Sequence, residues 1–235
     1  MLLSEVTVNE LLALLNVFIN PSETVRRIRG KKIAWFLPVL LGGVIMAAFN
    51  YTQPRMMMQV LRNNPPAGVS AAENAKKLDE MAPNMEAQAR FSTVTAPMFV
   101  ALMALMTAGI TFAACVILQI NVRFPDLFNL VAYVNIIDAL QTLAHLLVLR
   151  GRGDAVTMYD LTHHFGLDLL LAGHPSKLLT GIATYFSIFT VWHIVAFAFG
   201  LAALANISKG KAFLATAPGW VIGLLSALVG ALARP

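Results

Sequence analysis

The segment LFNLVAYVNIIDALQTLAHLLVL, residues 127–149, decides the fold class of this chain. It is apolar over a length that can cross about 30 Å of hydrocarbon, which takes roughly 20 helical residues. Asp138 stands near its midpoint, and His145 follows on the same segment. A carboxylate at that depth costs about 2.5–3.5 kcal/mol on insertion scales, so such side chains normally face the interior of a helix bundle. The segment therefore predicts a membrane helix whose Asp138 has polar neighbours.

The composition of the whole chain agrees with a membrane protein. Hydrophobic residues make up 58% and charged residues 12%, with a mean hydropathy of +0.71, whereas soluble domains carry about 25% charged residues. We predict an all-α, polytopic integral membrane protein with five transmembrane helices, at approximately 33–52, 94–120, 127–149, 178–206 and 212–233. The fourth segment exceeds one crossing, so we expect it to tilt or to project from the bilayer.

Residues 1–32 are predicted to form a separate cytoplasmic segment before the membrane domain of residues 33–235. Thr7 and Glu10 are spaced as a capping box, and one helical face is apolar (Val8, Leu11, Leu12, Leu15, Phe18 and Ile19). In NPSE, Asn20 and Pro21 start a second helix. Basic residues follow it (Arg26, Arg27, Arg29, Lys31 and Lys32). We expect an interfacial amphipathic helix and contacts with anionic lipid headgroups, although ordinary positive-inside anchoring explains these charges equally well.

The loop of residues 53–93 is predicted to be polar and partly helical. Ser70 and Glu73 form a second capping-box pattern that opens a polar helix, and Met56, Met57 and Met58 suit a contact surface or the membrane surface. The density of Lys and Arg favours a cytoplasmic N-terminus and an outer C-terminus. In the last segment Gly219, Gly223 and Gly230 lie close to one helical face, which indicates close helix packing or dimerisation.

Polar residues of the third segment fall on one helical face. Asn135, Asp138, Thr142 and His145 are spaced by three or four residues. His193 lies at a comparable depth in the fourth segment, so we expect it to pair with Asp138, with Tyr185 or Tyr133 as further donors. This intramembrane polar network is either a structural set of interhelical hydrogen bonds or a relay for protons or ions.

Catalytic signatures are missing from the sequence. The outer segment of residues 158–175 holds Asp160, His163, His164, Asp168 and His174, which give only a weak metal-site pattern. No HExxH, GxSxG, GxGxxG or P-loop motif occurs. We predict no enzymatic activity and no cofactor, with an outer-loop metal enzyme as a less favoured alternative. Because the basic residues flank apolar spans, we expect no nucleic-acid partner.

Four features together resemble one family, the Yip (Ypt/Rab-interacting protein) domain membrane proteins, in a bacterial-type form. NPSETVRRIRGKKIAWFLPVLL, residues 20–41, places a proline-started basic helix before the first span. A long polar outer helix follows it. INVRFPDLFNLVAYVN, residues 120–135, joins two spans by a short turn, and YFSIFTVWHIVAFAFGL, residues 185–201, forms the fourth span. The sequence departs from the family where Ile137 and Asp138 stand in place of a proline after the third-span tyrosine.

The resemblance implies a five-span membrane domain with a cytoplasmic N-terminus. It implies a non-enzymatic accessory or interaction subunit of a membrane assembly, associated with trafficking or with an exporter, in the bacterial inner membrane. The implied partner is a membrane protein such as an ABC-type exporter, or a second copy of the chain. A small proton- or ion-coupled transporter using Asp138 and His193 is the alternative function.

Overall fold

Ten α-helices and one short 3₁₀ turn (Gly153–Ala155) form the part of the chain that the computed structural model describes, residues 8–65, 68–162, 165–167 and 176–233. The helices are α1 (Val8–Ile19), α2 (Pro21–Ile28), α3 (Phe36–Asn63), α4 (Ala71–Ile117), α5 (Phe124–Val134), α6 (Ile136–Arg152), α7 (Met158–Thr162), α8 (Lys177–Tyr185), α9 (Ile188–Ala205) and α10 (Lys209–Ala233). Within these residues five helical segments are long and apolar enough to cross a membrane: α3, α4, α5–α6 together, α9 and α10. The predicted all-α, five-span fold is confirmed.

The N-terminal helices pack into the bundle. Asn20 caps α2 by accepting a hydrogen bond from the backbone N–H of Glu23 at 3.2 Å, and Pro21 occupies the first turn. The α1–α2 pair contacts α5, and α2 also contacts α9. Their inner faces join the main hydrophobic core through buried side chains (Ala13, Val17, Val25 and Ile28). Residues 8–28 thus share one core with the membrane-spanning helices.

The predicted outer loop of residues 53–93 is mostly a helical hairpin. The first span, expected to end near residue 52, continues as α3 to Asn63. Ser70 caps α4 by accepting from the N–H of Glu73 at 3.2 Å. The polar helix that starts there does not end before the second span, because α4 runs unbroken for 47 residues. The predicted second span, at about residues 94–120, is therefore the second half of a longer helix.

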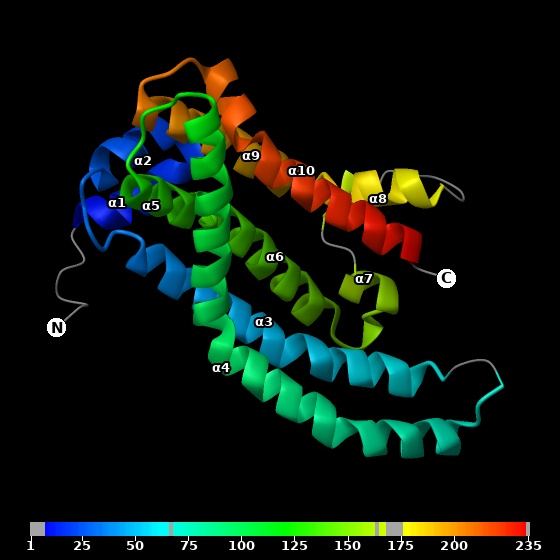
Figure 1. The fold of residues 1–235 in the computed structure, drawn as a ribbon. Helices are drawn as coiled ribbons and strands as arrows, with labels where there is room; N and C mark the ends of the chain where they lie inside the picture. The colour runs from blue at the N-terminus through cyan, green and yellow to red at the C-terminus, as the bar shows by residue number, and fades with distance from the viewer. Residues whose placement is uncertain (1–7, 66–67, 163–164, 168–175, 234–235) are drawn as a thin grey trace.

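α4 bends near its middle, as Figure 1 shows. Its first half runs beside α3, and its second half turns away from α3. Pro97 lies inside α4, and proline lacks the amide that an interior helical hydrogen bond needs. Gly43 of α3 lies against it, since a Cβ placed on Gly43 would lie 2.7 Å from Cα of Pro97. Only glycine allows the two backbones to approach so closely.

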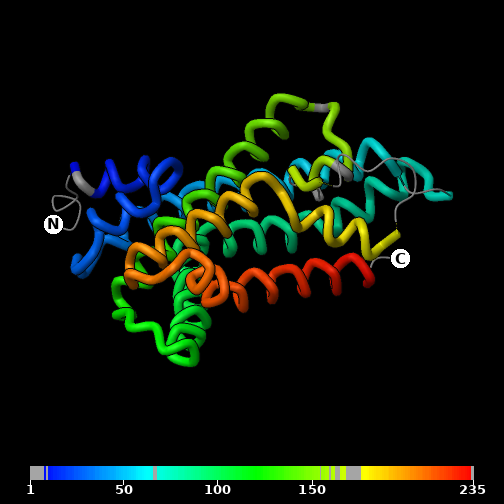
Figure 2. Tube along the Cα trace, turned by 90° about the horizontal axis from the view of Figure 1, so that it is seen from above, coloured from blue at the N-terminus to red at the C-terminus, as the bar shows by residue number. Residues whose placement is uncertain are grey.

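The third and fourth predicted spans are both interrupted. The third divides at Asn135 into α5 and α6, although the backbone there stays nearly helical (φ −61°, ψ −13°). The segment of residues 178–206 is two helices, α8 and α9, which separate at Phe186 and Ser187. Ser187 caps α9 by accepting from the N–H of Thr190 at 3.0 Å. The expected single segment is thus two helices. Only α9 of the two has the length and hydropathy of a membrane-spanning helix, and α8 lies beside the end of α10 (Figures 1 and 2).

Helix α5 lies at the centre of the main hydrophobic core. Its buried residues form the middle of the main core, together with side chains of α1, α2, α4, α9 and α10 (among them Leu127, Leu130, Val131, Tyr133 and Val134 of α5 itself). Seen along the direction of Figure 2, α1 and α2 lie at one end of the molecule, and the α3–α4 connection and the end of α10 lie at the other. The polar site described next lies where α5 gives way to α6.

Candidate polar site within the membrane spans

Asp138 of α6 and His193 of α9 lie together between the spans. The Nδ1 atom of His193 is 3.0 Å from Oδ2 of Asp138. The His193 side chain is 19% exposed, and that of Asp138 is 54% exposed. The pair forms a salt bridge when the imidazole is protonated, and a neutral imidazole leaves one negative charge at the site.

The interruption at Asn135 places Asp138 in the first turn of α6. The N-terminal end of a helix carries a partial positive charge from its aligned peptide dipoles, which favours a carboxylate there. The side chain of Asp138 thus has two sources of stabilisation inside an apolar span, the helix end and the imidazole of α9. The pairing with His193 was expected from the sequence, whereas the helix start after Asn135 was not.

A cavity of about 290 Å³ opens beside the pair, between α4, α6, α9 and α10. Its polar lining includes Asn135, Tyr185 and Thr190 in addition to the pair. Trp220 also lines it, and the buried indole N–H of this residue has no hydrogen-bond partner in the described part of the chain. A buried donor without a partner is costly, so this wall suits water or a polar ligand.

A second cavity, of about 200 Å³, lies on the other side of Asp138, between α3, α4 and α6. It is lined mainly by apolar side chains, together with Asn135, Asp138 and Thr142. Asn135, Asp138 and Met103 line both cavities. Asp138 therefore borders both cavities.

The other residues expected in this network are only partly gathered. Thr142 donates a hydrogen bond to the backbone oxygen of Asp138 at 3.0 Å. Tyr185 lines the larger cavity, but its hydroxyl donates to the backbone oxygen of Trp220 at 2.8 Å. Tyr133 is buried and its hydroxyl points to the backbone oxygen of Glu10, 3.5 Å away. The side chain of Gln141, which the sequence did not single out, accepts from Ser187 at 3.4 Å.

A comparison with protein-family models identifies the family of this chain. A model of the Yip1 domain matches residues 15–230. The chain belongs to the Yip1 domain family. No curated protein and no solved structure matches it. The five candidate spans of this Yip1-domain protein make it an integral membrane protein.

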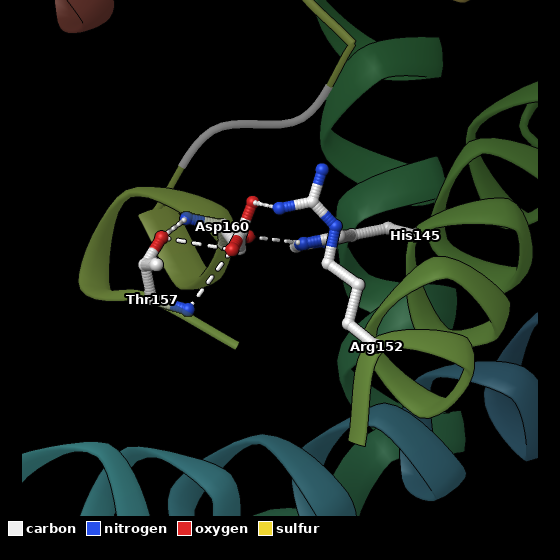
Figure 3. Close-up of polar contacts among 4 residues, drawn as sticks. All are labelled: His145, Arg152, Thr157 and Asp160. Atoms are coloured by element: carbon white, nitrogen blue, oxygen red, sulfur yellow. Dashed lines mark hydrogen bonds and ion pairs between the residues drawn. The ribbon is translucent and has the colours of Figure 1, made fainter. Parts of the chain in front are cut away.

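His145 does not join the Asp138 site in this Yip1-domain protein. It is buried, and its Nε2 atom lies 2.7 Å from the backbone oxygen of Asp160 (Figure 3). Its ring also contacts the rings of Phe49 and Phe165, with centroids 5.5 and 6.4 Å away. The face of α6 that carries Asp138 therefore takes part in two different sites. Asp138 contacts α9, and His145, near the other end of this face, contacts α7.

Asp160 is the centre of the second site in the Yip1-domain protein (Figure 3). Its carboxylate accepts from the N–H and hydroxyl of Thr157 at 2.9 and 2.8 Å, and from Arg152. Desolvation by burial works to raise the pKa of Asp160, but the Thr157 hydrogen bonds and the Arg152 hydrogen bond and charge outweigh it and lower the pKa. The Asp160 N–H donates back to the Thr157 hydroxyl at 3.2 Å. This reciprocal pattern is a capping box, readable in the sequence as TMYD.

The weak metal pattern receives no support from the described part of the chain. His163, His164, Asp168 and His174 lie outside the described residues, and Asp160 is engaged by Thr157 and Arg152. Among the described residues, no three His, Cys, Asp or Glu side chains group as metal ligands.

The basic residues after α2 differ in their surroundings. Glu23 pairs with both Arg26 and Arg27, whose Nε lies 2.8 Å from its carboxylate. Lys31 lies 3.2 Å from Glu10 of α1. Arg29 and Lys32 are exposed. Arg29 and Lys32 therefore have the surroundings that headgroup contact needs. Arg26 and Arg27 pair with Glu23 within α2, and Lys31 joins the segment after α2 to α1 through Glu10.

Two buried polar residues of α5 fix the segment between α2 and α3. The side chain of Asn129 accepts from the Trp35 N–H at 3.0 Å and donates to the Lys31 backbone oxygen at 2.7 Å. Asp126 accepts from the N–H of Gly30 at 2.7 Å. Sequence reasoning missed both residues. Their position in a span-entry motif of the Yip resemblance, residues 120–135, was the available signal.

Proposed function

We propose that this Yip1-domain protein is a non-enzymatic accessory subunit of a membrane assembly, associated with trafficking or with an exporter. One observation carries the proposal. Helix α1 is held to the bundle by one face and keeps a stripe of large apolar side chains exposed on the other (Val8, Leu11, Leu12, Leu15 and Ile19). At 12 residues it is too short to cross a membrane.

The attachment of α1 is specific. Trp192 of α9 donates its indole N–H to the Phe18 backbone oxygen at 3.1 Å, and Thr24 donates to that of Ala13 at 3.0 Å. Leu15 is 64% exposed on the opposite face, whereas Ala13 and Val17 are completely buried. The exposed apolar side chains of α1 are spaced by three, four and seven residues. This spacing suits a helix that binds in an apolar groove of a partner protein.

The charge of α1 favours a protein partner over the lipid surface. Helices that lie in the membrane interface usually carry Lys or Arg on their polar face. α1 has neither, and its one acidic residue, Glu10, is buried and paired with Lys31. The partner we propose is a membrane protein such as an ABC-type exporter, or a second copy of this chain.

The test is site-specific photo-crosslinking in native membranes. A benzophenone residue in place of Leu15 is expected to give one protein adduct of defined mass. The same residue in place of Val229, an exposed apolar position of α10, is the control and is expected to give lipid adducts. An adduct of twice the chain mass identifies a homo-oligomer. Lipid adducts alone at Leu15 would refute the accessory role argued from α1.

We further propose the bacterial inner membrane as the location, with a cytoplasmic N-terminus and an outer C-terminus. In that orientation Arg29 and Lys32 lie at the cytoplasmic surface and contact anionic headgroups. Labelling of single cysteines from either side of sealed vesicles tests the orientation.

A second candidate function follows from the polar site. Asp138 and His193 beside a cavity suit a proton- or ion-coupled transporter, since ionisable groups inside membranes often serve such paths. Proteoliposomes with the purified chain and a pH-sensitive dye test it. Proton flux that Asp138→Asn abolishes would support transport through this site. Equal flux with both proteins would exclude a role for Asp138, and no flux with either would exclude proton transport.

A further inference from the structure

A polar-rimmed hollow outside the Asp138 site lies between the second half of α3 and the first half of α4. It has a volume of about 420 Å³. Its walls combine basic and apolar side chains, among them Tyr51, Arg55, Met58, Arg62, Met85 and Arg90. Neither the Asp138 site nor the α1 surface uses any of these residues.

The cavity carries an excess of positive charge. Three arginines line it, and Glu86 is the one carboxylate among the lining residues. Arg90 lies 2.8 Å from Glu86, and Arg62 lies 2.5 Å from Asp79, which is outside the cavity. Both are exposed pairs, which contribute little and exchange readily with other anions. Arg55 stacks on the ring of Tyr51, 3.6 Å from the centroid, so its guanidinium edges can still donate.

The depth of the cavity is set by the sequence of both helices. No Asp, Glu, Lys or Arg occurs in residues 33–54, and none occurs in residues 91–122. Arg55 directly follows the first of these two uncharged segments, and Arg90 directly precedes the second. Tyr51 at the same level fits the boundary between hydrocarbon and headgroups, where aromatic side chains are enriched. The cavity therefore lies at headgroup depth.

Exposed apolar residues of α4 lead from the cavity toward the second span. Arg90, Val94 and Met98 are spaced by four residues, so they lie on one face of α4. Val94 is 80% exposed and Met98 is 69% exposed. This face of α4 thus combines a charged residue at the cavity with apolar residues beyond it. The first suits the headgroup of a lipid and the second suit its acyl chain.

We propose that this cavity binds one anionic phospholipid. Arg55 and Arg90 bind the phosphate and the charged headgroup, because guanidinium groups donate paired hydrogen bonds to phosphate oxygens. Met58 and Met85 pack against the glycerol region, since methionine adapts to irregular partners. One acyl chain runs along Val94 and Met98. The site is independent of the partner surface on α1.

Native mass spectrometry of the full-length protein in detergent tests the proposal. Phosphatidylglycerol and phosphatidylcholine with the same acyl chains are added in equal amounts. The wild-type chain is expected to retain one phosphatidylglycerol, in preference to phosphatidylcholine. The double variant Arg55→Gln/Arg90→Gln is expected to bind it about tenfold more weakly or worse, because two charge-assisted contacts are lost.

The matched control also removes two positive charges, both from positions of α4 outside the cavity. Lys76→Gln/Lys77→Gln should bind phosphatidylglycerol as the wild type does. Equal retention of the two lipids by the wild type, or equal losses in both double variants, would overturn the proposal. The wild-type comparison keeps this test decisive even if the arginine variant fails to fold. Competition by soluble glycerol phosphate as strong as that by the lipid would point to a phosphate site without a lipid, and would also overturn it.

Discussion

His193 Nδ1 lies 3.0 Å from Asp138 Oδ2 and joins α9 to the start of α6. Polar contacts between membrane helices contribute about 0.6–2 kcal/mol. A double-mutant cycle with Asp138→Asn and His193→Gln should therefore give a coupling energy in that range. Thermal unfolding in detergent measures it. Strictly additive effects would show that the two side chains stabilise the bundle independently.

The contact of Gly43 with Pro97 predicts that alanine substitutions at two glycines differ sharply in their effect on stability. Gly43→Ala should destabilise the protein by about 1–3 kcal/mol, because the new Cβ meets backbone that cannot move aside. Gly109→Ala in α4 is the control, since a Cβ there has no neighbour within 4 Å. This control should be neutral or stabilising by up to about 1 kcal/mol, the helix propensity gained over glycine. Similar thermal midpoints for the two variants would contradict the close crossing.

Asn129 is expected to hold the segment between α2 and α3 in place. Asn129→Ala leaves the Trp35 N–H and the Lys31 backbone oxygen without their side-chain partner, and each unpaired buried group costs about 1–3 kcal/mol. Hydrogen exchange in residues 30–35 should accelerate as well. Asn121→Ala, at an exposed position, should change neither the thermal midpoint nor the exchange.

The lowered pKa of Asp160 predicts that the packing of α7 depends on pH. Because the folded protein favours the carboxylate, this stabilisation is present above the ordinary pKa of about 3.9. It is lost as the pH falls through the lower pKa of the folded form. Hydrogen exchange in residues 157–162 should therefore rise, after correction for the intrinsic pH effect, on acidification below about pH 4.

Asp160→Asn should remove that acid-dependent rise, because the amide has no titrating proton. It should also loosen α7 at neutral pH, with a cost of about 1 kcal/mol, as for a lost helix cap. An identical acid response in the variant and the wild type would assign the effect to another group.

Features that depend on neighbours along the chain could be predicted from sequence. The apolar spans, the caps at Asn20 and Ser70, and the turn at residues 120–126 follow from local hydropathy and from side chains three residues apart. The sequence did not predict that the polar helix of the outer loop continues without a break into the second span. Pro83 and Pro97 each remove one backbone hydrogen bond from α4, but neither ends the helix.

The sequence by itself determined that this is an all-helical membrane protein with five spans, because crossing hydrocarbon demands long apolar helices with satisfied backbone groups. It also singled out Asp138 and His193, because charge in such a helix is rare. Tertiary structure decided their distance, the separation of His145 from them and the burial of α1 and α2 against α5 and α9. Those outcomes depend on helix crossings set by contacts such as Gly43 with Pro97, whose residues lie far apart along the chain and carry no local signal.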